Sequence, residues 1–303
     1  SYPNIPTISQ FLENNGQDIR TLYQSNNCWT SLKRAAGRIA YKDDVITKRL
    51  EKGMANLLHH NTASFLHFIE LFIDGSKQYL DTKNYKYALM LYYALFQDRL
   101  DKTGFASIYE ALELIHKEMY SYFKQEISEI ISYLLAHLQL KTMPLGEDVL
   151  PGLELYGCYT REEIFTLVGR QTEARKMQGS VTGVFNLSEC NATLLFVTLN
   201  KSDKDFSPST QYNDYLINEH YFHWQSQNTD SHQNNGGQRY TKQADTQNKI
   251  ILFVREEKKD GYGNTCPFHC FGLVEYMSSH DDFPMNITWK LQQPAMAQYV
   301  KAI

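Results

Sequence analysis

The chain has 303 residues, of which 42% are hydrophobic and 21% are charged, and its formal net charge at pH 7 is −4. A chain of this length and composition can fold as two globular domains, each with its own core. The negative charge argues against a protein that coats nucleic acid by electrostatic attraction alone, because such proteins are usually basic. Any contact with nucleic acid must then come from a few placed cations or from another part of a longer polypeptide.

Three absences narrow the class of protein further. No apolar run approaches the roughly 18 residues that a membrane-spanning helix requires, and the start lacks the basic and apolar layout of a secretory signal. The cysteines are odd in number and scattered, which argues against a disulfide framework. They are Cys28, Cys158, Cys190, Cys266 and Cys270. We therefore expect a cytoplasmic protein with reduced thiols and no membrane partner.

Residues 1–150 have the apolar period of helices. Tyr85 to Phe96 is apolar all round, which predicts the central helix of a bundle. Apolar residues then recur at intervals of three and four from Ile108 to Leu138, which predicts one long helix or two helices joined by a break. This half carries 16 basic and 17 acidic residues, so its charge predicts no DNA-binding surface. We expect a helical connector domain with a mechanical role.

A change of period marks the domain boundary. Pro144 to Gly152 supplies turn residues and two prolines where the apolar period changes from about 3.6 to about 2. Thr160 and Glu163 then form a capping-box pattern for a short helix that ends at Gly169. The predicted strands are 183–187, 192–199, 221–225, 250–255, 269–276 and 286–291. The predicted class is α+β, with an all-α bundle over 1–150 followed by a β-rich domain over 151–303. That domain would be a mixed or antiparallel, strongly bent sheet or a partly closed barrel with flanking helices.

Aromatic and polar residues alternate unusually closely between Tyr212 and Gln227. Such a mixture fits a pocket in which aromatic faces stack on a flat ligand while amides and a carboxylate contact its edge. The alternative is that each aromatic residue packs in a core, which is the commoner role of aromatics in β-rich domains. The next segment, 228–248, is rich in polar residues and glycine. It is either a flexible surface loop or a loop that orders on nucleic acid, anchored by Arg239 and Tyr240.

Four motifs in this region carry a family resemblance. They are Ser-Pro-x-Thr-x-Tyr-x-Asp-Tyr at 207–215, Phe-His-Trp-Gln-Ser-Gln at 222–227, Gly-Gln-Arg-Tyr at 237–240 and Leu-Phe-Val-Arg at 252–255. From about residue 155 to the end, the chain resembles the domain of formerly unknown function that follows superfamily-two helicase cores. Those proteins include ATP-driven type IV restriction endonucleases with a phospholipase-D-type nuclease. The resemblance implies a target-recognition domain for duplex DNA containing 5-methylcytosine or 5-hydroxymethylcytosine. Helicase and nuclease domains of the same parent chain would be its partners, and ATP and Mg²⁺ would act there.

The expected mechanism is extrusion of the modified cytosine from the stack, because the aromatics and amides fall on strands and loops. Tyr212, Tyr215 or Trp224 would stack on the base, and Asp214 would accept a hydrogen bond from its exocyclic amine. The other expected base or DNA contacts are His223, Gln225, Gln227, Arg239 and Tyr240. The expected phosphate contacts, which carry no sequence information, are Lys201, Lys204, Ser207 and Thr210.

Catalytic patterns are weak or missing in the sequence. There is no Gly-x-x-x-x-Gly-Lys-Ser/Thr phosphate loop, so we expect no ATP hydrolysis and no cofactor in this chain. Cys266-x-x-His269-Cys270 lacks the second ligand pair of a structural zinc site. Asp245 with Glu256-Glu257-Lys258 is a loose match to a metal-dependent nuclease and is the third hypothesis. The second is a helicase-associated interaction domain that does not read bases. We expect no catalytic residues and no bound metal.

Overall fold

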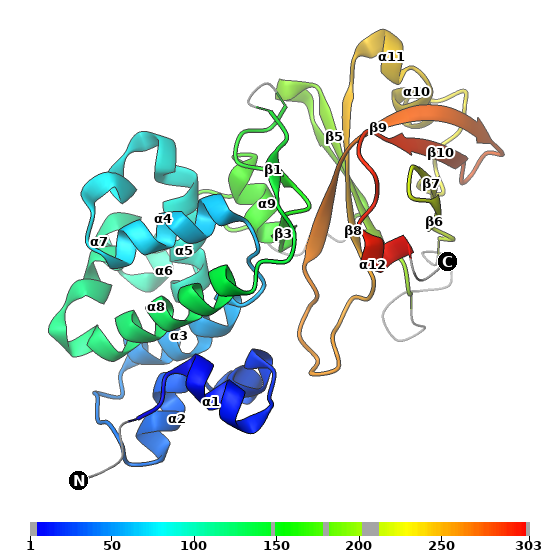
Figure 1. Ribbon diagram of the computed structural model, residues 1–303. Coiled ribbons are helices and arrows are strands. Elements are labelled where there is room, and N and C mark those ends of the chain that lie inside the picture. The colour runs from blue at the N-terminus through cyan, green and yellow to red at the C-terminus, as the bar shows by residue number, and fades with distance from the viewer. Residues whose placement is uncertain (1–4, 147–148, 178–181, 202–211, 301–303) are drawn as a thin grey trace. The chain divides into compact units, whose positions relative to one another are not determined.

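The computed structural model describes residues 5–146, 149–177, 182–201 and 212–300 (Figure 1). Contacts divide the chain into two compact units. The first, the helical unit, is Ser1–Lys141 with Glu162–Gln178, and the second, the sheet unit, is Thr142–Arg161 with Gly179–Ile303. Within the described residues, every helix is too short or too polar to cross a bilayer.

The helical unit is built around α5. Its elements, with 3-10 helices marked η, are α1 (Ile8–Asn15), η1 (Ile19–Asn26), α2 (Trp29–Ala35), α3 (Val45–Met54), η2 (Ala55–Leu57), α4 (Ala63–Ile73), η3 (Lys77–Leu80), η4 (Thr82–Asn84), α5 (Tyr85–Phe96), α6 (Leu100–Thr103), α7 (Ile108–Glu113), η5 (Leu114–His116), η6 (Glu118–Tyr120) and α8 (Ser121–Ala136). Every residue of α5 from Ala88 to Phe96 is buried, which confirms the predicted central helix. The long pattern is two helices, because the backbone becomes extended at Lys117 (φ −71°, ψ 143°) between α7 and α8.

A buried carboxylate joins two of these helices. Glu126 of α8 accepts hydrogen bonds from the backbone N–H groups of Trp29 and Thr30, both at 2.7 Å. These are first-turn donors of α2, which have no partner within that helix. Burial raises the pKa of Glu126, and the backbone donors counter this only in part. The carboxylate therefore fixes a seven-residue helix against α8.

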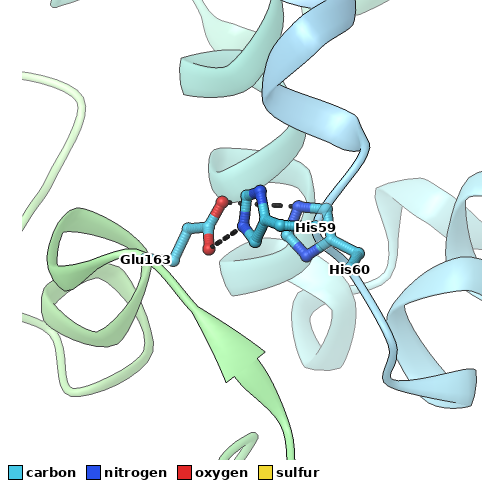
Figure 2. Close-up of side chains that lie close together, drawn as sticks. All are labelled: His59, His60 and Glu163. Carbon is cyan, nitrogen blue, oxygen red and sulfur yellow. Dashed lines mark hydrogen bonds and ion pairs between the residues drawn. The ribbon is translucent and has the colours of Figure 1, made fainter. Parts of the chain in front are cut away.

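The predicted short helix is present as α9 (Arg161–Leu167), and Gly169 beyond its end has a positive φ of 75°. From its first turn, Glu163 reaches His59 and His60, which lie between η2 and α4 (Figure 2). All three residues belong to the helical unit by its contacts.

The sheet unit contains a mixed, open sheet. Its order is β4 (Val184–Leu187), β5 (Ala192–Thr198), β8 (Lys249–Arg255), β9 (Phe268–His280), β10 (Asn286–Leu291), β7 (Tyr221–Gln225) and β6 (Tyr215–Asn218), and β3 (Cys158–Tyr159) also pairs with β9. Only β5 and β8 are parallel among the described pairs. β4 and β6 end the order, so the mixed sheet is confirmed but a closed or partly closed barrel is not. The remaining elements are β1 (Met143–Pro144), β2 (Glu154–Leu155), η7 (Ser188–Cys190), α10 (Asn235–Thr241), α11 (Gln243–Thr246) and α12 (Ala297–Val300).

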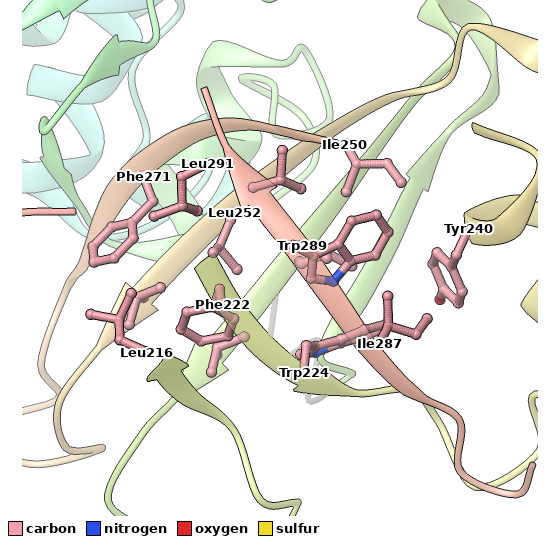
Figure 3. Close-up of a cluster of buried hydrophobic side chains, with 14 of the residues drawn as sticks. Leu216, Phe222, Trp224, Tyr240, Ile250, Leu252, Phe271, Ile287, Trp289 and Leu291 are labelled. Carbon is pink, nitrogen blue, oxygen red and sulfur yellow. The ribbon is translucent and has the colours of Figure 1, made fainter. Parts of the chain in front are cut away.

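The core of the sheet unit centres on three large aromatic side chains (Figure 3). Trp224 of β7 and Trp289 of β10 have ring centroids 6.1 Å apart, and Tyr240 lies 5.1 Å and 6.0 Å from them. Their exposed fractions are 4%, 0% and 0%. Trp224 and Tyr240 are therefore packing residues in this structure.

The polar segment 228–248 is largely structured, so the expectation of a flexible loop is wrong. It contains α10 and α11, and Tyr240 on α10 enters the core. The adjacent glycines of this segment, Gly236 and Gly237, allow close packing because neither position has room for a Cβ atom. A Cβ atom at Gly237 would lie 2.0 Å from the carbonyl oxygen of Ser231 and 2.4 Å from Sδ of Met285. A larger residue at 237 would push α10 away from the sheet.

Candidate nucleic-acid interface

Strand β7 presents its residues alternately to two faces of the sheet. Phe222 and Trp224 belong to the core cluster, so Tyr221, His223 and Gln225 point to the opposite face. Residues of β6 and β10 that pair with these three residues face the same side, so the set extends across three strands. We call this side of the three strands the outer face. Its residues are Tyr215, Tyr221, His223, Gln225, Asn286, Thr288 and Lys290. The residues predicted to bind DNA are thus divided between two faces.

A stacked aromatic pair lies on the outer face. Tyr215 of β6 is opposite His223 of β7, with ring centroids 4.7 Å apart and planes 26° from parallel. Tyr215 is 44% exposed, whereas His223 beneath it is 9% exposed. Burial lowers the pKa of His223, and nearby Asp214 offsets this only in part. At neutral pH His223 is therefore uncharged, and Tyr215 offers aromatic surface to solvent.

A row of amides and a carboxylate crosses the same face. Gln225 accepts a hydrogen bond at Oε1 from the backbone N–H of Asn213 at 2.7 Å and donates from Nε2 to Oδ1 of Asn286 at 2.9 Å. Asn286 donates in turn to Asp281 at 2.9 Å, and His280 lies 2.8 Å from the same carboxylate oxygen. A side-chain amide has two lone pairs and two N–H groups. Gln225 thus keeps one of each without a partner among the described residues.

The Lys201–Asp214 pair has a different role from the one expected. Lys201 Nζ lies 2.6 Å from Oδ2 of Asp214 and also donates to the carbonyl of Tyr212 at 2.6 Å. The other carboxylate oxygen of Asp214 accepts from the backbone N–H of Gln225 at 2.9 Å. The two side chains are 8% and 4% exposed. Burial raises the pKa of Asp214 despite the ammonium group beside it. Both side chains are thus buried and paired with each other, and the pair fixes the start of β6 against β7.

The other predicted contacts are placed as follows. Trp224 and Tyr240 are in the core and neither ring faces solvent, so in this structure neither offers the surface for DNA that the sequence suggested. Tyr212 and Gln227 are half-buried, as is Arg239 on α10. Lys204, Ser207 and Thr210 lie outside the described residues.

The nuclease pattern does not assemble. Asp245 precedes β8 and Glu256 follows it, so the two carboxylates are separated by a seven-residue strand, about 20 Å long. One Mg²⁺ cannot bridge that distance.

Cys266, His269 and Cys270 are not brought together as three potential metal ligands among the described residues. His269 Nδ1 lies 2.7 Å from the hydroxyl of Tyr299, and burial raises the pKa of Cys270 to about 12. In the part of the chain that the structure describes, His59, His60 and Glu163 are the one set of three potential ligands brought within 4.8 Å.

Sequence reasoning missed Asn286, Asp281 and His280. Asn286 had a usable signal, since it precedes buried Ile287 by one position on a predicted strand and must face the other way. Asp281 and His280 had none, because Asp281 lies after β9 and His280 ends β9 beyond the predicted strand 269–276.

Comparison with known proteins adds a family similarity. A search of curated proteins found no match. Residues 153–302 match the family model described as "Domain of unknown function (DUF3427)". The match spans α9 and the whole main sheet, including every strand of the outer face. The second half of the chain is therefore similar to the domains of the DUF3427 family.

Proposed function

We propose that residues 153–302 form a DNA-binding module that recognises 5-methylcytosine or 5-hydroxymethylcytosine in duplex DNA. The module would be the target-recognition part of a modification-dependent restriction enzyme. Residues 1–150 would connect it to helicase and nuclease domains. The observation that carries the proposal is the outer face, where the Tyr215–His223 pair lies beside the amide of Gln225.

The outer face suits an extruded base better than an intact groove. Taking a base out of the stack costs a few kcal/mol, and stacking on an aromatic side chain returns about 1–3 kcal/mol. Tyr215 offers the exposed ring for that stacking. Gln225 retains one donor and one acceptor, the complement that the edge of a cytosine requires. Asp214 contributes indirectly, by holding the backbone of Gln225 in place.

Phosphate contacts would come from few cations, in keeping with the net charge of −4. Lys290 is exposed at the end of the outer face, opposite Tyr221. In this proposal Lys290 would contact the backbone of a strand whose base stacks on Tyr215. Such a contact strengthens binding to all sequences equally.

The test is a fluorescence-anisotropy titration of the 303-residue chain with three duplexes that differ only at one cytosine, which is plain, methylated or hydroxymethylated. We expect tighter binding to at least one modified duplex. Tyr215→Ala should remove most of that preference. Lys290→Ala should weaken binding to all three duplexes equally and reduce the salt dependence by about one charge.

Equal affinity for the three duplexes would refute base recognition. That result would favour the second hypothesis, a domain that positions a helicase without reading bases.

A further inference from the structure

A compact group of side chains that can bind metal lies in the helical unit (Figure 2). His59 Nε2 is 2.8 Å from Oε2 of Glu163, and His60 Nε2 is 3.3 Å from Oε1. The imidazole rings of His59 and His60 are 4.2 Å apart, and Phe65 covers the other side of His60 with a centroid distance of 4.5 Å. Both oxygens of the carboxylate thus face imidazole nitrogens from adjacent residues.

The deepest of these residues lacks hydrogen bonds. His60 is 2% exposed, and neither of its ring nitrogens has a hydrogen-bond partner of good geometry among the described residues. The contact with Glu163 at 3.3 Å is close but poorly aligned for a hydrogen bond. A buried polar group without a well-aligned partner is costly, so an imidazole held in this way against a carboxylate suits a site that a further ligand would complete.

We propose that His59, His60 and Glu163 bind a divalent transition-metal ion of the zinc class. Two nitrogen ligands and one carboxylate oxygen form a donor set that zinc uses in proteins, with a fourth position left for water. Bonds of about 2.0–2.1 Å in a tetrahedron place ligand atoms about 3.3 Å apart. The ligand atoms that the three residues offer, one from each, all lie within 4.8 Å of one another, so small shifts of these side chains would bring them to this spacing.

A bound ion would join two distant parts of the helical unit. The histidines lie between η2 and α4, and Glu163 lies on α9 about 100 residues later. The ion would link these elements and stabilise the folded unit by mass action. The alternative is a metal-free cluster in which a protonated histidine balances the carboxylate.

The test uses the full chain without an affinity tag, titrated with zinc against a competing chelator. We expect one tightly bound zinc in the wild type and none at this site in Glu163→Gln. The matched control is Glu70→Gln, which breaks an exposed His67–Glu70 contact of 2.6 Å in the same unit and should keep the zinc. At free zinc about 100-fold above Kd, the unfolding constant of the wild type should fall about 100-fold, raising its melting temperature by about 5–10 °C.

Failure of Glu163→Gln to fold would not remove the test, because X-ray absorption of the wild-type zinc form reports the ligands directly. Nitrogen and oxygen ligands with two imidazoles are expected. Sulfur ligands, equal zinc binding by the wild type and a folded Glu163→Gln, or no tight zinc in the wild type would each overturn the proposal and favour the metal-free cluster.

Discussion

Trp224 and Tyr215 lie on opposite faces of neighbouring strands, so replacing Trp224 by alanine should mainly lower stability, whereas replacing Tyr215 should mainly weaken DNA binding. Trp224 is 4% exposed and packs between Tyr240 and Trp289. Trp224→Ala should therefore lower the free energy of unfolding by about 3–5 kcal/mol. Tyr215 is 44% exposed and stacks on His223 alone among the described rings. Tyr215→Ala should cost at most about 1.5 kcal/mol of stability. It should weaken binding to modified DNA by about 1–3 kcal/mol, or about 5- to 150-fold.

Urea denaturation followed by tryptophan fluorescence measures the first quantity. Trp289 remains in the sheet unit as a probe when Trp224 is replaced, and Trp29 reports on the helical unit. With a slope of about 1–3 kcal/mol per molar urea, Trp224→Ala should lower the midpoint of the sheet unit by at least about 1 M. If Trp224→Ala keeps the wild-type midpoint but loses modified-DNA binding, Trp224 is a binding residue and the assignment of the two faces is wrong.

Two further predictions concern buried groups. Glu126→Gln should lower the free energy of unfolding by about 1–3 kcal/mol, because the amide nitrogen of glutamine cannot accept a hydrogen bond from the second of the two α2 N–H groups. Chemical denaturation measures this change, and an unchanged midpoint would show that the contact contributes nothing to stability. Burial raises the pKa of the Cys28 and Cys270 thiols, so a thiol reagent should label half-exposed Cys190 and Cys266 well before these two. Mass spectrometry measures the order of labelling, and early labelling of Cys270 would contradict its burial.

Local signals were sufficient for most elements. The apolar period of Tyr85 to Phe96 predicted a buried helix because a helix apolar on all sides can only be central. Each of the six predicted strands is present, since runs of β-branched and aromatic residues bounded by turns have few alternatives. The missed strands β1, β2, β3 and β6 have two to four residues, too few for a period to show.

The features that the sequence did not predict depend on contacts between residues far apart in the chain. Alternation along β7 separates His223 from Trp224, but which of the two faces the core depends on β10, some sixty residues later. The composition of 228–248 indicated a loop, whereas burial of Tyr240 and the close approach at Gly237 make part of it helical. Glu163 meets His59 only in the folded chain, and nothing in the local sequence of either residue indicates it.

The most direct measurement of the central claim is photo-crosslinking of the chain to a duplex that carries a photoreactive cytosine analogue at the modified position, followed by peptide mapping. Recognition on the outer face predicts crosslinks to β6 or β7, at or beside Tyr215 and His223, with yields that fall in Tyr215→Ala. Crosslinks confined to residues 1–141, or to surfaces of the sheet unit away from β6, β7 and β10, would contradict it.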